Sequence, residues 1–388
     1  MPLLVQLCIT LVLILTIIPL GRRFGLPTLL GYILSGLITG QIIRYFPQFA
    51  ERNWIDEISY IAVLAFMFIL GLQLRPQRMW QTRKEFDRID IAHVIIMGII
   101  TTGLFYLVFE LNWKVSVLLG FAFVIPSNML IKQLLSKSHI KDLITSYDLF
   151  NDYKVHYCIA VFLIALLPLF AQHFSVLGLL AYIAITLTLI SGLFLLRIYI
   201  VKWIEKTKYP HANTLWVGLT FLVIICGLLF SQYFMLSPAI AALAAGIVMA
   251  DAEFRADIAQ SIAPFQGILL SALFTSFGLY IDFSSITHYP WHITDMLVSL
   301  IVIKLLFSIV IYSIRKYHTQ NLFQASILNT QSGEFAFIIL FLIYSQQLIA
   351  PEMMSVLSLV IVLSMFITPL LLKGIQIFSN DFEQHTQR

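Results

Sequence analysis

The stretch from Trp113 to Leu135, WKVSVLLGFAFVIPSNMLIKQLL, decides the fold. It is as long and as apolar as a helix that crosses a bilayer, which needs about 20 mostly apolar residues. Pro126 stands in its middle, and proline lacks an N–H group and clashes with the preceding helical turn. The polar pair Ser127 and Asn128 follows at once, and such side chains cap helix ends. We therefore expect a membrane helix that is interrupted at Pro126, Ser127 and Asn128.

A second stretch, residues 322–347, repeats this pattern in LFQASILNTQSGEFAFIILFLIYSQQ. Its polar run places Ser332, Gly333 and Glu334 in the middle of an apolar span. Non-helical backbone at membrane depth is tolerated only where it is buried in protein or lines a cavity. We expect a second interruption at these three residues, and a simple kink is the alternative for either stretch taken alone.

The composition indicates that lipid surrounds most of the chain. Of 388 residues, 60% are hydrophobic and 11% are charged, against about 25% charged in soluble domains. The sequence predicts an all-α polytopic membrane protein of about 13 transmembrane helices over residues 1–375, with a short cytoplasmic tail at 376–388. The expected helices are 3–20, 26–43, 57–74, 91–109, 113–135, 144–170, 175–201, 211–233, 236–250, 264–280, 293–314, 322–347 and 351–372. The first is expected to be retained because its charges follow the apolar run, whereas a secretory signal carries them before it.

The distribution of basic residues predicts the orientation. Lysine and arginine favour cytoplasmic loops. Nineteen of the 24 basic residues fall on one side or at the C-terminus, and three, Arg44, Arg52 and Lys114, fall on the other. The remaining two, Lys154 and Lys304, lie within expected spans. We expect the N-terminus outside and the C-terminus in the cytoplasm, in the cell (inner) membrane.

The two interruptions occupy matching positions. The first lies in the fifth expected helix, and the second lies in the fifth helix after the seventh, which serves as a linker. Because the linker is a single helix, an odd number, the second half of the chain is inverted in the membrane relative to the first. Paired interruptions in two inverted repeats are a sequence signal for a transporter binding site.

Two further places hold polar residues inside expected spans, where such groups mark function by default. Asp152 and His156 are four residues apart and share a helix face, and histidine titrates near neutral pH. The alternative is that residues 148–154 are the solvated start of a helix and that His156 is a packing residue. Lys304 stands alone in an apolar run. It is either a counter-charge at an ion site or a brace for the carbonyl ends of broken helices.

Six short motifs occur in order along nearly the whole chain. They are Arg22–Pro27 with Gly31–Gly36, Phe68–Leu74, Ala244–Gly246 with Glu253–Arg255, Pro264–Gly267, Phe277–Leu279, and Gly333–Phe337. This arrangement resembles the Kef-type branch of the cation:proton antiporters, the cation:proton antiporter-2 family. The resemblance implies a homodimer whose helices 1–3 and 8–10 form a dimerisation part and whose helices 4–6 and 11–13 form the core. It also implies exchange of potassium or sodium for protons, with Lys304 near the ion site.

The sequence departs from this family in the sixth helix, where the family carries a Gln-Asp pair that exchanges cation for proton. An ungapped alignment places the pair on His156 and Tyr157, so the aspartate is absent. A shifted register places it on Asn151 and Asp152 but breaks agreement on both flanks. The expected ion and proton site therefore comprises Asp152, His156, Tyr157 and Lys304. Tyrosine, with a reference pKa of about 10, stays neutral at pH 7 and binds a cation poorly.

These features favour a monovalent cation:proton antiporter in the lipid bilayer. The alternatives are a transport-inactive scaffold or regulatory membrane protein with the same fold, and a carrier of another small solute. Enzyme activity is not expected, since the sequence shows no nucleophile–base pair, phosphate loop or metal constellation. No cofactor or metal is expected, because Cys8, Cys158 and Cys226 stand singly in apolar runs. The net charge of +4 does not predict a nucleic-acid partner.

Overall fold

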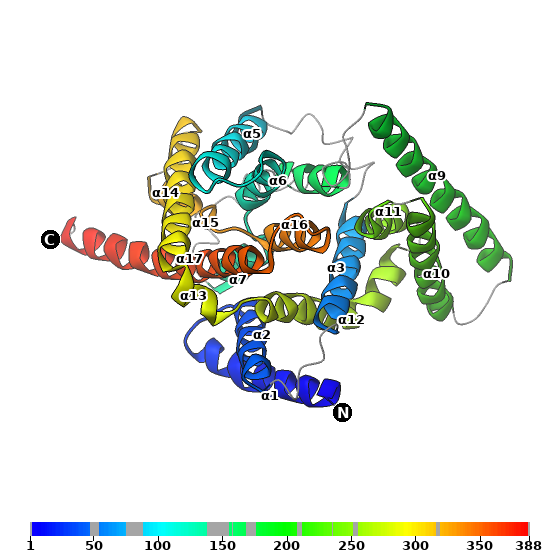
Figure 1. Ribbon diagram of the computed structural model, residues 1–388, viewed down its shortest axis with the longest axis horizontal. Coiled ribbons are helices and arrows are strands. Elements are labelled where there is room, and N and C mark those ends of the chain that lie inside the picture. The colour runs from blue at the N-terminus through cyan, green and yellow to red at the C-terminus, as the bar shows by residue number, and fades with distance from the viewer. Residues whose placement is uncertain are drawn as a thin grey trace. The chain divides into compact units, whose positions relative to one another are not determined.

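The computed structural model describes residues 2–46, 54–74, 88–137, 155–156, 158–167, 176–207, 212–234, 236–250, 255–315 and 319–386. These residues form helices and connecting turns, with no strand among them (Figure 1). The described helices before residue 138 are α1 (Pro2–Arg23), α2 (Thr28–Tyr45), α3 (Trp54–Gln73), α5 (Arg88–Gly103) with the π-helical turn η3 (Leu104–Val108), α6 (Trp113–Val124) and α7 (Asn128–Lys137). Those after it are Cys158–Leu167, α9 (Val176–Thr207), α10 (Ala212–Tyr233), α11 (Pro238–Ala250), α12 (Arg255–Leu279), α13 (Phe283–His288), α14 (Pro290–Ile314), α15 (Thr319–Leu328), α16 (Glu334–Ser345) and α17 (Pro351–Thr386).

The polytopic all-α membrane fold is confirmed. Each of the thirteen expected ranges contains a helix, although the sixth is described only in part. Six apolar segments of the described chain are long enough to cross a bilayer, one of them the interrupted segment Trp113–Leu135, and six shorter apolar helices accompany them. The number of spans stays a prediction. The residues expected as a tail continue α17 as helix to Thr386.

The chain divides into two compact units, one of residues 1–52, 85–163 and 274–388 and the other of residues 53–84 and 164–273. The dimerisation and core parts expected from the resemblance remain a prediction, and the two units do not coincide with them. Helices α1 and α2 belong to the same unit as α5, α6 and α14–α17, whereas the resemblance grouped them with the eighth to tenth helices.

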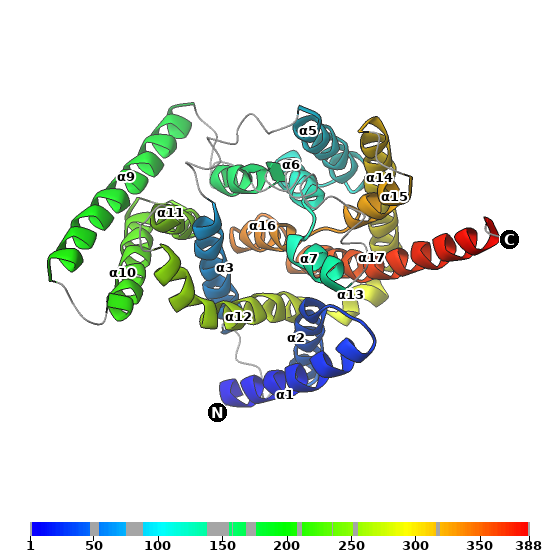
Figure 2. The same cartoon turned by 180° about the vertical axis from the view of Figure 1, so that it is seen from behind.

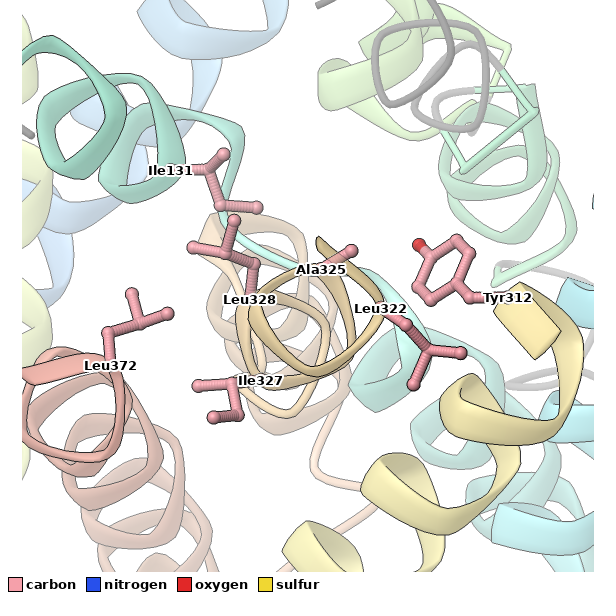
Figure 3. Packing of buried hydrophobic residues seen from close by; sticks show 7 residues of the cluster. All are labelled: Ile131, Tyr312, Leu322, Ala325, Ile327, Leu328 and Leu372. Carbon is pink, nitrogen blue, oxygen red and sulfur yellow. The ribbon is translucent and has the colours of Figure 1, made fainter. Parts of the chain in front are cut away.

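The first unit contains both interrupted helices. An apolar cluster joins α7, α14, α15 and α17 (Figure 3). Its buried members are Ile131, Tyr312, Leu322, Ala325, Ile327, Leu328 and Leu372. Helix α16 packs against α6 and α17. Each short half-helix is therefore held by packing against longer helices, which matters because isolated helices of about ten residues are marginally stable.

The second unit is built on α3, which packs along α11 (Figure 2). Gly71 and Gly246 allow this close approach. A Cβ atom on Gly71 would lie 2.8 Å from the Cα atom of Gly246 and 2.3 Å from the carbonyl oxygen of Leu243. Small residues at such positions let membrane helices approach backbone to backbone. Helices α9 and α10 also contact α11.

Candidate functional site

The first interruption separates α6 from α7. Helix α6 ends at Val124, and Ile125 is extended, with φ −72° and ψ 114°. An extended residue is what a following proline favours, and Pro126 follows. Ser127 then begins α7 as a cap: its Oγ accepts a hydrogen bond from the Leu130 N–H at 3.2 Å. The local chemistry of Pro126 and Ser127 thus explains both the stop and the restart.

The second interruption separates α15 from α16. Helix α15 ends at Leu328 and α16 begins at Glu334, so five residues lie between the two helices. Gly333 precedes α16 in an extended conformation, with φ −102° and ψ −167°. The Thr330 hydroxyl donates to the Ile327 carbonyl oxygen at 2.7 Å and so binds an acceptor at the end of α15.

The two interruptions cross in direct backbone contact. The Gly333 N–H donates to the Ile125 carbonyl oxygen at 2.9 Å, and the Ser332 hydroxyl donates to the Phe123 carbonyl oxygen at 2.9 Å. A Cβ atom on Gly333 would lie 2.6 Å from the carbonyl carbon of Pro126 and 2.6 Å from the Ser127 nitrogen. Because real Cβ atoms do not approach backbone atoms so closely, only glycine fits this position without displacement.

Lys304, on α14, lies at the carbonyl ends of the broken helices. Its side chain is 1% exposed. Its Nζ donates to the Phe123 carbonyl oxygen at 2.7 Å and also to the Gln331 carbonyl oxygen. Phe123 belongs to the last turn of α6, where unpaired carbonyls carry partial negative charge. These contacts are those of a brace, one of the two roles that the sequence left open.

Glu334 lies at the amide ends of the same broken helices. It is the first residue of α16 and is 1% exposed. Its carboxyl group forms hydrogen bonds with the Ser127 side chain and the Met129 backbone at the start of α7, and the positive charge of Lys132 attracts it. Two helix N-termini, which carry partial positive charge, therefore face one buried acid.

Acceptor oxygens remain at this crossing. Among the described residues, the Oε2 atom of Glu334 and the Oε1 atom of Gln331 are buried and have no hydrogen-bond partner. Buried acceptors without donors are rare in proteins, since each costs free energy. Carboxylate and carbonyl oxygens are also the ligands of hard cations. The arrangement can hold a small cation beside the carboxylate of Glu334.

A second group of polar residues lies in the same unit. His93 on α5 and His156 are each 2% exposed, and their ring centroids are 6.3 Å apart. The buried carboxylate of Asp90 pairs with Arg315 at the end of α14. Tyr312, one turn before Arg315, lies with its ring centroid 6.4 Å from that of His93.

Sequence reasoning missed His93, Asp90, Arg315 and Tyr312 as members of one cluster. The sequence did carry a signal for His93 and Asp90, because Asp90, His93 and Thr101 recur at helical spacing on one face of an apolar span. Arg315 follows the expected helix 293–314 and was one of the nineteen basic residues assigned to the cytoplasmic side. Its ion pair with Asp90 joins residues 225 positions apart, a relation that no local pattern shows.

The structure brings together the two predicted interruptions and Lys304. It places His156 beside His93. Asp152 and Tyr157 lie outside the described residues. No group of three or more histidine, cysteine, aspartate or glutamate side chains that could hold a metal ion occurs within the described ranges.

A polytopic helical protein whose two interrupted helices cross at buried charged groups belongs to the class of membrane ion transporters. This chain is a member of the sodium/hydrogen exchanger family, whose transmembrane region matches residues 9–375. The family consists of cation:proton transporters rather than enzymes.

Solved structures of the sodium proton antiporter MjNhaP1 from Methanocaldococcus jannaschii are similar to this chain. The structure at pH 8 has 18% sequence identity and a TM-score of 0.63, over 97% of this chain and 96% of that one. A second, from an electron microscopy map, has 17% identity and a TM-score of 0.59, over 95% and 93%. At these identities the likeness concerns the fold.

Proposed function

We propose that this protein exchanges a monovalent cation, potassium or sodium, for protons at the crossing of the two interrupted helices. One observation carries the proposal: a buried carboxylate, Glu334, and a buried ammonium, Lys304, lie at opposite poles of the crossing. The ammonium balances the carbonyl ends, and the carboxylate balances the amide ends. Membership of the exchanger family supports the reaction class.

Glu334 has the chemistry that exchange requires. A carboxylate binds a cation through its oxygen atoms, and a proton bound in the same core excludes that cation by charge. The Oε2 atom of Glu334 and the Oε1 atom of Gln331 supply acceptor oxygens for the cation. The hydrogen bonds from Lys304 go to backbone carbonyl groups, whose dipoles stabilise its positive charge within the crossing. Glu334 thus takes the part of the aspartate missing from the ungapped alignment of the sixth helix.

Asp152, His156 and Tyr157 remain part of the proposed site. In the shifted register Asp152 takes the position of the family's aspartate, and in the ungapped register His156 and Tyr157 replace the acid–amide pair. We further propose a Kef-type protein of the cell (inner) membrane with its N-terminus outside and its C-terminus cytoplasmic. Two inverted repeats and a homodimer formed by helices 1–3 and 8–10 complete this proposal, which rests on the basic-residue distribution and the motif resemblance.

Reconstituted protein tests the reaction. Purified protein in proteoliposomes with an internal pH dye is given potassium or sodium pulses between about pH 6 and 9. We expect cation-dependent proton flux from the wild type and from Glu352→Gln, which changes an exposed acid on α17. Glu334→Gln should reduce the flux more than about tenfold, because an amide binds neither a proton nor a cation in place of a carboxylate. Wild-type protein that is folded but gives no flux with either cation refutes the exchange proposal.

The second candidate function is a transport-inactive scaffold with the exchanger fold. It is favoured by one observation, the loss of the family's aspartate in the ungapped alignment of the sixth helix onto His156 and Tyr157. Flux that is present in the wild type and lost in Glu334→Gln excludes it. The third candidate, a carrier of another small solute, predicts uptake of a radiolabelled anion above that of empty vesicles.

A further inference from the structure

The first unit also contains a buried pair of histidines, His93 and His156. His93 comes from α5 and His156 from the helical residues 155–156, and their rings meet edge to face at 6.3 Å between centroids, with an interplanar angle of 89°. Both side chains are 2% exposed. The pair is therefore titratable. Burying ionisable side chains in spanning helices costs free energy, so such residues usually have a function.

Apolar side chains pack around the pair, and charged residues lie on the same helices. Val94 and Val155, the chain neighbours of the two histidines, belong to one buried apolar cluster. Phe307 packs on His93 with ring centroids 5.6 Å apart. Besides the two histidines, the buried or partly buried titratable and charged groups on α5 and α14 are Asp90, Lys304, Tyr312 and Arg315. The others on these helices, Arg88, His292 and Asp295, are exposed.

Among the described residues of this cluster, the partners of the other charged groups leave the histidines as the groups that change charge near neutral pH. Asp90 is compensated by Arg315. Lys304 is compensated by the carbonyl groups of the crossing. Tyrosine and arginine keep one protonation state near neutral pH, whereas histidine changes its charge between about pH 5 and 8.

The separation of the rings limits the pair to one proton near neutral pH. Two unit charges 6.3 Å apart at an effective dielectric constant of about 20 repel each other enough to separate two protonation steps by about two pH units. The two steps therefore belong to the pair and not to either residue.

Tyr312 connects the pair to the crossing. Its ring lies against His93, and its hydroxyl oxygen accepts a hydrogen bond from the Nδ2 atom of Asn329. Asn329 is the first residue after α15 and so opens the second interruption. Two side chains, Tyr312 and Asn329, thus connect the histidine pair to the second interruption, and Glu334 follows at the other end of that interruption.

We propose that His93 and His156 form a one-proton site that binds the exchanged proton while the cation site at the crossing is empty. This inference rests on the proposed cation:proton exchange. A proton adds to one imidazole nitrogen as one monovalent cation leaves, and it departs as a cation returns, so the core holds the same net charge in both states. The Asp90–Arg315 pair is a positioning element that fixes α5 against α14 on the side of His93.

Histidine titration tests the site without transport. Protein with isotope-labelled histidine in detergent micelles is titrated from about pH 5 to 9 and observed by NMR, with His93→Gln, His156→Gln and the exposed His292→Gln for assignment. In the wild type we expect two steps about two pH units apart. In either pair variant the remaining histidine should titrate in one step, and His292→Gln should leave both steps in place. A His93 titration unchanged by His156→Gln overturns the inference.

Flux measurements separate the failure of this inference from failure of the proposed function. In the wild type the apparent KM for the cation should rise about tenfold for each pH unit below the first protonation step. His93→Gln should flatten this dependence, and His292→Gln should keep it. Wild-type flux with an unchanged pH profile in a folded His93→Gln protein refutes the histidine site and leaves exchange intact. Absence of wild-type flux refutes exchange, and the NMR titration then decides the one-proton pair alone.

Discussion

Replacing Gly333 by alanine tests whether the direct crossing of the two interruptions holds the first unit together. Gly333 is extended, with φ −102° and ψ −167°, a conformation that alanine adopts readily, so any effect is steric. The added Cβ atom would lie 2.6 Å from the Pro126 carbonyl carbon and the Ser127 nitrogen. Both are backbone atoms of the opposite interruption and cannot rotate away, so the two segments must separate.

The magnitude follows from two losses and one gain. Overpacking of a filled interior costs about 1–3 kcal/mol. Separation also weakens the 2.9 Å hydrogen bond from the Gly333 N–H to the Ile125 carbonyl oxygen, and such a bond contributes about 0.5–1.5 kcal/mol. Alanine restricts the unfolded chain and recovers about 0.4–1 kcal/mol. We expect Gly333→Ala to lower the free energy of unfolding by about 1–3 kcal/mol.

The assay is reversible denaturant or thermal unfolding of the purified protein in detergent, paired with proteoliposome flux. Gly103→Ala is the matched control in the same unit, because no atom lies within 4 Å of its Cβ position and its backbone is helical at φ −59° and ψ −41°. The control should be as stable as the wild type or gain up to about 1 kcal/mol from helix propensity. Equal stability and equal flux of Gly333→Ala and Gly103→Ala would refute the reasoning that the crossing is closed by backbone contact.

Three further substitutions probe other contacts. Lys304→Met removes two charge-assisted hydrogen bonds to buried carbonyl groups and should lower the free energy of unfolding by about 2–4 kcal/mol and abolish flux; wild-type stability would contradict its role as a brace. In the second unit, Gly71→Ala should destabilise the packing of α3 on α11 by about 1–3 kcal/mol, whereas Gly192→Ala, with nothing within 4 Å, should not; equal unfolding midpoints would count against this. Tyr312→Phe leaves the buried amide of Asn329 without its acceptor and should cost about 1–2 kcal/mol, and an unchanged midpoint would show that this hydrogen bond does not contribute.

The interruptions and the membrane fold followed from sequence because their causes are local. Pro126 lacks an N–H group and forces extended backbone on Ile125, and the structure ends α6 just before them. Gly333 stands in a polar run within an apolar span, and α16 begins directly after it. The cost of exposing backbone to lipid is likewise a property of each segment, so composition predicted the class of protein.

The partners of the buried polar groups followed only from the tertiary structure. Lys304 was visible as a lone charge, but its acceptors, Phe123 and Gln331, lie 181 and 27 residues away. His93 and His156 were separate residues in two expected helices, and their contact depends on how α5 packs beside the segment that carries His156. The helical period fixes only which residues share a face of one helix, so it does not predict contacts between two helices.

The sequence by itself thus determined that lipid surrounds this protein and where its two helices are interrupted. Both depend on the chemistry of short segments. The tertiary structure decided which charges neutralise which helix ends and which histidines meet. Those relations depend on packing between helices far apart in the chain, where side-chain volume and backbone approach, as at Gly333, select one arrangement.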